Sequence, residues 1–161
     1  MSAVDINSSD ELRDLYRELI LDHARSPRHF GRLDDATHTA EGINPLCGDK
    51  LRLFVRLDDD DRISNASFEG SGCAISVASA SLLTDMIIGL TVQQALDYFA
   101  AVTMRLAGPD TNQDQDSPLE LGKIRALEGV RDFPSRVKCA TLAWHALNSA
   151  IHGRSTPVST E

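Results

Sequence analysis

Residues 51–86 read LRLFVRLDDDDRISNASFEGSGCAISVASASLLTDM, and the apolar period changes within this stretch. Its first part has the period of a half-buried strand, because Leu51, Leu53, Val55 and Leu57 alternate with Arg52, Phe54 and Arg56. The four aspartates 58–61 predict a turn, and a second strand follows with Ala66 and Phe68 facing inward. After Gly72 the apolar residues recur at helical spacing, at Ile75, Ala78, Leu82, Leu83 and Met86. Strands followed by helices indicate an α+β fold.

The flanking sequence adds one strand and three further helices. Residues 37–43 could supply a third strand. Ser8 and Glu11 have the spacing of a capping box for a first helix, which Ser26-Pro27 should end. Gly89 is placed to follow the helix after Gly72; a third helix should run from a cap at Thr91 to Gly108, and the last from near Ser135 to Gly153. We therefore expect a small three-stranded antiparallel sheet packed against several helices.

The chain length fits one domain spanning residues 1–161, with disorder expected at 1–7 and 154–161 and a polar loop at 109–118. A net charge of −8 argues against a nucleic-acid partner, which would require a basic surface. No apolar run approaches the roughly 20 residues that cross a bilayer, and the first ten residues do not resemble a secretory signal. We therefore expect a cytoplasmic protein without a membrane partner.

Three cysteines are an odd number for a disulfide framework, and each is expected at the boundary of an element. Cys47 and Asp49 flank Gly48 in a predicted turn, and Gly48 permits the tight backbone that would aim both side chains at one point. Cys73 should open a helix, where the helix dipole favours a thiolate. Cys139 should lie in about the first turn of the last helix and gain the same effect.

Three thiolates and one carboxylate form a four-coordinate set that suits Zn²⁺. Thiolate-rich sites also suit iron–sulfur clusters. Alternatively, each cysteine is a small buried hydrophobic residue, because the spacing matches no compact zinc motif. Spacing alone leaves these alternatives open.

Three motifs resemble the SufU/IscU family, also described as NifU N-terminal-like. The sequences are NPLCGD at 44–49, GSGCAIS at 70–76 with ASAS at 78–81, and RVKC at 136–139, and the first helix is also similar. The resemblance implies an α+β fold, a role in iron–sulfur cluster biogenesis with a cysteine desulfurase as sulfur donor, and downstream cluster assembly machinery as partner. It places the metal ligands on Cys47, Asp49, Cys73 and Cys139.

Two segments resemble the SufU branch more than IscU. IscU-type proteins have histidine before the third cysteine, where this chain has Lys138, and they carry Leu-Pro-Pro-Val-Lys where this chain reads FPSRVK at 133–138. The long separation between Cys73 and Cys139 also resembles SufU. The resemblance thus favours zinc-dependent sulfur transfer from a SufS-type desulfurase, with Zn²⁺ as cofactor and a desulfurase histidine replacing a released ligand. The alternatives are a scaffold that binds iron or a [2Fe–2S] cluster, and a small structural zinc module.

Candidate catalytic residues are Cys47, Asp49 and Arg136. Cys47 is the expected persulfide acceptor, because a turn moves more easily than a helix. Asp49 is a harder and more exchangeable ligand than a thiolate, which suits a site that opens. Arg136 and Lys138 could offset the negative charge of the ligands, or both could be solvated surface cations. The histidines are expected to have no ligand role, with His145 and His152 facing solvent.

Overall fold

The structure is a computed structural model, and it describes residues 2–108, 122–154 and 157–160. The expected polar loop at 109–118 lies outside the described residues. The elements in chain order are α1 (Ser2–Arg25), β1 (His38–Asn44), β2 (Asp49–Leu57), β3 (Ile63–Ser71), α2 (Ala74–Ile87), α3 (Val92–Ala107), the 3-10 helix η1 (Gly122–Val130), α4 (Pro134–Ile151) and β4 (Val158–Ser159). This arrangement confirms the α+β prediction.

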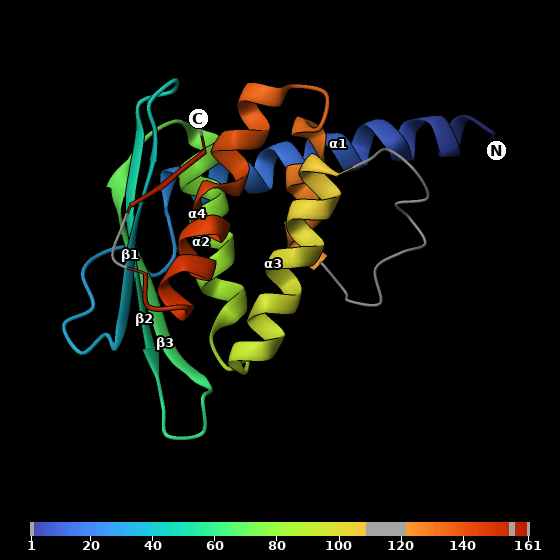
Figure 1. Ribbon diagram of the computed structural model, residues 1–161. Coiled ribbons are helices and arrows are strands. Elements are labelled where there is room, and N and C mark those ends of the chain that lie inside the picture. Colours follow the sequence, from blue (N-terminus) through green and yellow to red (C-terminus); the bar gives the residue numbers. More distant parts are fainter. Residues whose placement is uncertain (1, 109–121, 155–156, 161) are drawn as a thin grey trace.

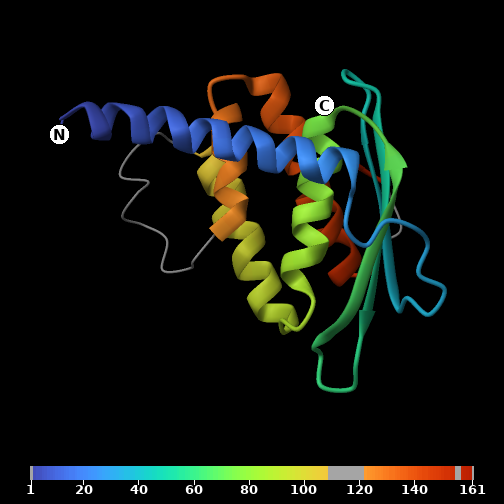
Figure 2. The same cartoon turned by 180° about the vertical axis from the view of Figure 1, so that it is seen from behind.

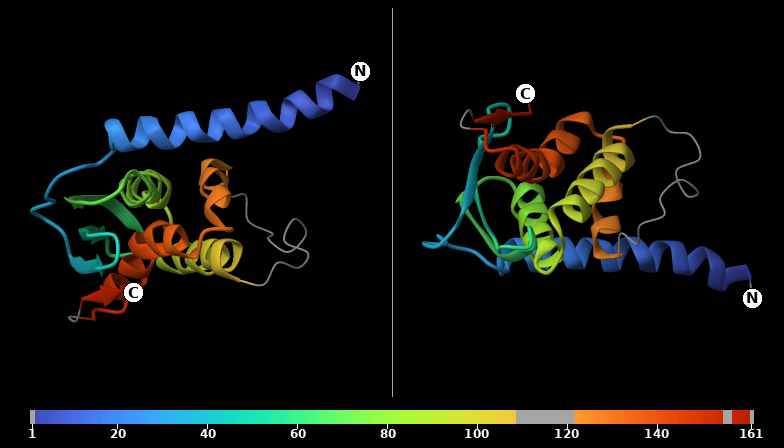
Figure 3. Two further views of the ribbon diagram at one scale, coloured as in Figure 1. Left: turned by 90° about the horizontal axis from the view of Figure 1, so that it is seen from above. Right: turned by 60° about the horizontal axis from the view of Figure 1, so that its bottom comes forward.

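The sheet and the helices form two layers, with the helices on one face of the sheet (Figure 1). The strand order is β3-β2-β1-β4. Helix α4 packs on β1 and β2, whereas α2 packs on β3 and against α4. From behind, α1 crosses the helical layer, and its N-terminal part projects beyond it (Figures 2 and 3). None of the helices described is long and apolar enough to span a membrane.

The sheet has four strands rather than the three expected. Strands β1, β2 and β3 pair antiparallel as predicted, and β4 adds to the free edge of β1 in parallel. Thr160 completes this contact, because its N–H donates to the Ile43 carbonyl at 3.2 Å and its hydroxyl donates to the Lys138 carbonyl at 3.1 Å. A strand of two residues is too short to show a period, so no sequence pattern predicted it.

Described elements reach into both chain ends, where the expected disorder stays a prediction. Helix α1 begins at Ser2, N-terminal to the predicted cap at Ser8, and β4 lies within the segment 154–160. The end of α2 and the start of α3 lie where the sequence predicted them. Thr91 caps α3 in a capping box with Gln94, and Gly89 follows α2 at a φ of 95°.

The core lies between the inner face of the sheet and helices α2 and α4. Alternate residues of β2 enter it, as the period-two pattern predicted, and Trp144 of α4 is among its largest fully buried side chains. Helix α2 is buried around most of its surface and carries small residues there. The hydroxyl of Ser79 donates to the Ala140 carbonyl of α4 at 2.5 Å, so this buried polar group is satisfied.

His23 at the end of α1 connects that helix to α2. It is 1% exposed, and its Nδ1 lies 2.7 Å from the hydroxyl oxygen of Ser81. The same oxygen accepts the Arg28 N–H at 2.8 Å, so Ser81 joins the end of α1 and the segment after it to α2. Burial holds the pKa of His23 below its usual value, which favours the neutral imidazole.

We predict that His23 makes folding sensitive to mild acid. The unfolded chain binds a proton at His23 near pH 6.5, whereas the folded chain binds it only at lower pH. The contribution of His23 to the free energy of unfolding is therefore fully present above pH 6.5 and is lost as the pH falls below that value. A tenfold difference in proton affinity corresponds to about 1.4 kcal/mol. Denaturant unfolding across this range should show a weaker pH dependence in His23→Asn, which keeps an acceptor for Ser81. The exposed His152 supplies the matched control, His152→Asn. An unchanged pH dependence in His23→Asn would contradict the assignment.

Candidate metal centre

The turn between β1 and β2 carries the first two predicted ligands. Asn44 and Asp49 face each other as the last pair of the antiparallel ladder. Within the turn the Cys47 N–H donates to the Asn44 carbonyl at 3.2 Å, and Gly48 has a φ of 71°. The backbone at 48 favours glycine because side chains rarely adopt this region. The turn leaves Cys47 exposed and places Asp49, only 3% exposed, at the start of β2.

Cys73 lies between β3 and α2 and is the N-cap residue of α2, as the sequence predicted. Its backbone N–H donates to Asp49 Oδ1 at 2.8 Å. A Cβ at position 72 would overlap both this carboxylate oxygen and the Ser76 hydroxyl, so glycine is needed there. The Asp49 carboxylate thus joins the start of β2 to the start of α2.

Cys139 completes the site from the helical layer. The candidate ligand atoms of Cys47, Asp49 and Cys139 all lie within 4.8 Å of one another. Cys73 lies outside this compact set, although its thiol is close enough to Cys139 to influence its pKa. The structure therefore brings the four predicted ligands to one end of the molecule, three of them in a tight cluster.

The donor set fits a zinc ion. Ligand atoms around a tetrahedral Zn²⁺ lie about 3.5–3.8 Å apart, given Zn–S near 2.3 Å and Zn–O near 2.0 Å. The cluster of Cys47, Asp49 and Cys139 needs only small movements to reach this spacing, and Cys73 is the fourth candidate. Three sulfurs and one carboxylate oxygen would close the coordination shell, and such ions keep their thiolates deprotonated.

The environment of Cys139 differs from the prediction. The residue is fully buried and lies in the second turn of α4, past the helix start where the dipole acts. Burial raises the pKa of the Cys139 thiol far above its usual range, and hydrogen bonding to Asp49, Cys47 and Cys73 raises it further. A thiolate here therefore depends on a nearby cation rather than on the helix dipole.

The two cations beside Cys139 in sequence point to different surfaces. Arg136 is exposed and lines a groove of about 870 Å³, formed with α1, the start of α2 and the end of η1. Lys138 is partly buried and lines a separate hollow of about 450 Å³ beside β4. Arg136 is thus available to a partner docked at the groove, and Lys138 faces away from it.

The histidines lie apart from the cluster of Cys47, Asp49 and Cys139. His145 is only partly exposed, in contrast to the expected solvent contact, because it packs edge-on against Phe99 with the ring centres 5.3 Å apart. Burial lowers the pKa of His145. His29 lies 3.5 Å from the Asp85 carboxylate.

Asn44 is the site residue that the sequence analysis quoted but gave no role. It is fully buried, and its amide nitrogen lies 3.5 Å from both Asp49 Oδ2 and Cys139 Sγ. Its position at the end of β1, directly before Pro45 and the turn to β2, is the sequence feature that could have indicated a role at the site. Only the folded chain shows that its side chain points at two of the predicted ligands.

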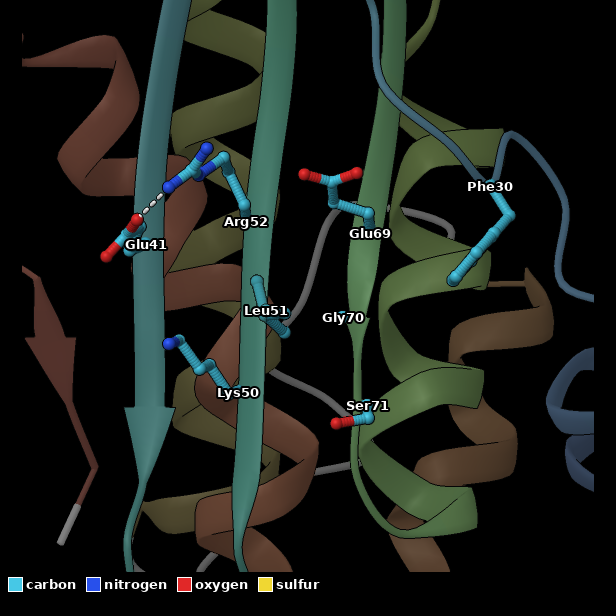
Figure 4. Close-up of a pocket in the computed structure, with 8 residues that line it drawn as sticks. All are labelled: Phe30, Glu41, Lys50, Leu51, Arg52, Glu69, Gly70 and Ser71. Carbon is cyan, nitrogen blue, oxygen red and sulfur yellow. Dashed lines mark hydrogen bonds and ion pairs between the residues drawn. The ribbon is translucent and has the colours of Figure 1, made fainter.

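The outer face of the sheet carries a different kind of hollow, of about 410 Å³ (Figure 4). Arg52 forms an ion pair with Glu41 on the neighbouring strand, and Glu69 flanks Arg52 on the other side. Hydrogen bonding to Arg52 lowers the pKa of Glu41. These charges largely pair with one another, so the sulfur-containing cluster is the stronger candidate for a functional site.

Three known proteins that are similar to this chain carry names from iron–sulfur cluster assembly or sulfur transfer. The model of the NifU-like N-terminal domain matches residues 15–140. The zinc-dependent sulfurtransferase SufU of Bacillus subtilis is 42% identical over 140 residues, covering 87% of this chain and 91% of the relative. The iron–sulfur cluster assembly scaffold protein IscU of Streptococcus pyogenes is 40% identical, covering 88% and 85%. The crystal structure of a putative iron–sulfur cluster assembly scaffold protein for the SUF system from Fervidobacterium islandicum superposes with a TM-score of 0.74 at 34% identity, covering 83% and 94%.

Gly72→Ala tests the close approach on which the site depends. The added methyl group would push the Asp49 carboxylate and Ser76 apart, so we expect a loss of about 1–3 kcal/mol in unfolding free energy together with weaker metal binding. Gly129→Ala is the matched control, because nothing lies within 4 Å of a Cβ there, and it should stay within about 1 kcal/mol of the parent. Denaturant unfolding and metal titration measure both effects. Equal behaviour of the two variants would contradict this account.

Proposed function

The chain belongs to the NifU-like N-terminal domain family, and we propose that within iron–sulfur cluster assembly it acts as a zinc-dependent acceptor of persulfide sulfur. The donor would be a cysteine desulfurase of the SufS type. The zinc ligands would be Cys47, Asp49, Cys73 and Cys139. A bound Zn²⁺ would supply positive charge that keeps the thiols deprotonated.

The observation that best supports the proposal is that the three thiols near the site differ in solvent exposure. Cys47 is exposed in a glycine-containing turn, whereas Cys139 is fully buried in a packed helix. Cys73 is intermediate and its backbone is bonded to Asp49. Cys47 can therefore leave the ligand set with little disturbance, while the other groups stay in place.

The transfer step uses the Cys47 thiolate as nucleophile. It attacks the outer sulfur of a persulfide on the partner's cysteine, so that a new S–S bond forms at Cys47. The S–S bond of the partner breaks, and the partner's cysteine leaves as a thiolate. One sulfur atom moves without any net oxidation or reduction, so no further reactant is required.

Arg136 and the exposed apolar residues around the site suit a docked protein donor. Leu46 is 66% exposed beside Cys47, and Phe133 is 58% exposed at the groove that Arg136 lines. In the proposal, Arg136 meets the donor at the groove and offsets negative charge near the site. Exposed apolar side chains next to a reactive group are typical of a protein interface.

A second candidate function is a scaffold for a [2Fe–2S] cluster. The cluster of thiols supports it, since iron–sulfur clusters are held by cysteine thiolates. The relative from Streptococcus pyogenes carries the name of such a scaffold. The buried carboxylate of Asp49 among the ligands favours zinc, because Zn²⁺ accepts carboxylate oxygen in a mixed tetrahedral set.

Freshly purified protein should contain one zinc per chain, and removing it should lower the melting temperature. Binding to the folded state alone stabilises by about 2.7 kcal/mol at a free metal concentration of 100 times Kd. Elemental analysis and thermal unfolding with and without a chelator measure this. Iron in place of zinc, with visible absorption from a cluster, would favour the scaffold function. Zinc without stimulation of a desulfurase would leave only a structural role.

Reaction with a cysteine desulfurase and cysteine should place the extra sulfur on Cys47. The exposed thiol in the turn can reach the partner, whereas Cys139 is fully buried. Mass spectrometry of the peptides locates the adduct, and Cys47→Ser should abolish it while the chain stays folded. Persulfide found mainly on Cys139 would reject this assignment and make α4 the mobile element.

A further inference from the structure

Asn44 contacts the site at three points. Its side-chain nitrogen lies 3.5 Å from Asp49 Oδ2 and 3.5 Å from Cys139 Sγ. Its backbone carbonyl accepts the Cys47 N–H at 3.2 Å. One residue therefore touches a buried carboxylate, a buried thiol and the backbone of the exposed cysteine.

The amide group of Asn44 is used as a donor. Its NH₂ carries two hydrogens, one for each of its two neighbours, and both neighbours are acceptors when ionised. Its Oδ1 is buried, and among the described residues it has no hydrogen-bond partner. A buried acceptor without a partner is unfavourable. The residue thus keeps an unsatisfied oxygen in the core while its NH₂ meets two ligands.

We propose that Asn44 is a positioning residue that holds Asp49 and Cys139 in the ligand set, so that Cys47 is the ligand that departs. This inference rests on the proposed function, since it concerns the same site. Hydrogen bonds to ionised groups are stronger than those between neutral ones, so the hold on both ligands increases when they carry charge.

The N–H···S contact also affects reactivity. A donor to a thiolate draws electron density from the sulfur, which makes Cys139 a poorer nucleophile than Cys47. The Asp49 carboxylate is fixed on both sides, because Oδ1 accepts from the Cys73 N–H and Oδ2 faces Asn44. The buried half of the ligand set is thereby constrained by hydrogen bonds from Asn44 and from the Cys73 N–H, whereas Asn44 contacts Cys47 through the backbone of its turn.

Asn44→Leu tests the proposal, because it keeps the size of the side chain and removes both donors. Asn44→Ser is the second variant, since it is too short to reach either ligand and tolerates its surroundings better. Asn65→Leu removes an amide from an exposed position on β3 and is the matched control. All are compared as full-length chains loaded with Zn²⁺ or Co²⁺, after circular dichroism has verified their fold.

Three measurements give the expected result. Competition with a chelator should show about 10- to 100-fold weaker Zn²⁺ binding in the Asn44 variants, the usual effect of losing a hydrogen-bond partner of a ligand. The thiolate-to-cobalt absorption band should shift relative to the parent. Alkylation of zinc-loaded protein, mapped by mass spectrometry, should modify Cys47 in the parent and both Cys47 and Cys139 in the Asn44 variants.

Binding within twofold of the parent, an unshifted cobalt band and alkylation confined to Cys47 would overturn the role of Asn44. Loss of the fold in both Asn44 variants would also overturn it and assign the residue to the fold. These outcomes are distinct from failure of the proposed function, which would show as a parent protein that binds no zinc or accepts no sulfur. A parent that binds zinc and accepts sulfur, with Asn44 variants that match Asn65→Leu, rejects only the inference.

Discussion

The hydrogen bond from the Cys73 N–H to Asp49 Oδ1 is the contact on which the arrangement of the site depends. A buried carboxylate is tolerated only when its oxygens are paired, so Asp49 must meet a donor to occupy the start of β2. The donor comes from the segment that ends β3 and opens α2. Gly72 makes the approach possible, because any Cβ there would overlap the carboxylate. A direct hydrogen bond thus joins two segments that carry candidate ligands.

The position of Cys139 depends on a second contact, between α2 and α4. Helix α2 presents small residues, and the Ser79 hydroxyl donates to the carbonyl of Ala140, the neighbour of Cys139. Close packing of α4 against α2 and the sheet buries Cys139 completely. The fold therefore supplies a buried thiol from the helical layer and an exposed thiol from a turn. The proposed sulfur transfer would need this combination, because one candidate ligand would have to move while the others stay in place.

Much of the fold could be predicted because its signals are local. The alternation in β2, the helical period after Gly72, and the ends at Gly89, Thr91 and Gly108 all follow from residues close in sequence. The unpredicted parts have no local signal. Strand β4 is two residues long and exists because the edge of β1 has free backbone groups for it.

The sequence by itself determined the fold class, the family resemblance and the four candidate ligands, because these follow from periodicity and from motifs of adjacent residues. Only the tertiary structure decided how the candidate ligands differ in burial and in contacts. It placed Cys139 in the second turn of a buried helix, beyond the reach of the helix dipole, and left Cys47 exposed. It also brought the Asn44 amide to Asp49 and Cys139. Burial and contacts between segments far apart in sequence are set by packing, and no local pattern encodes them.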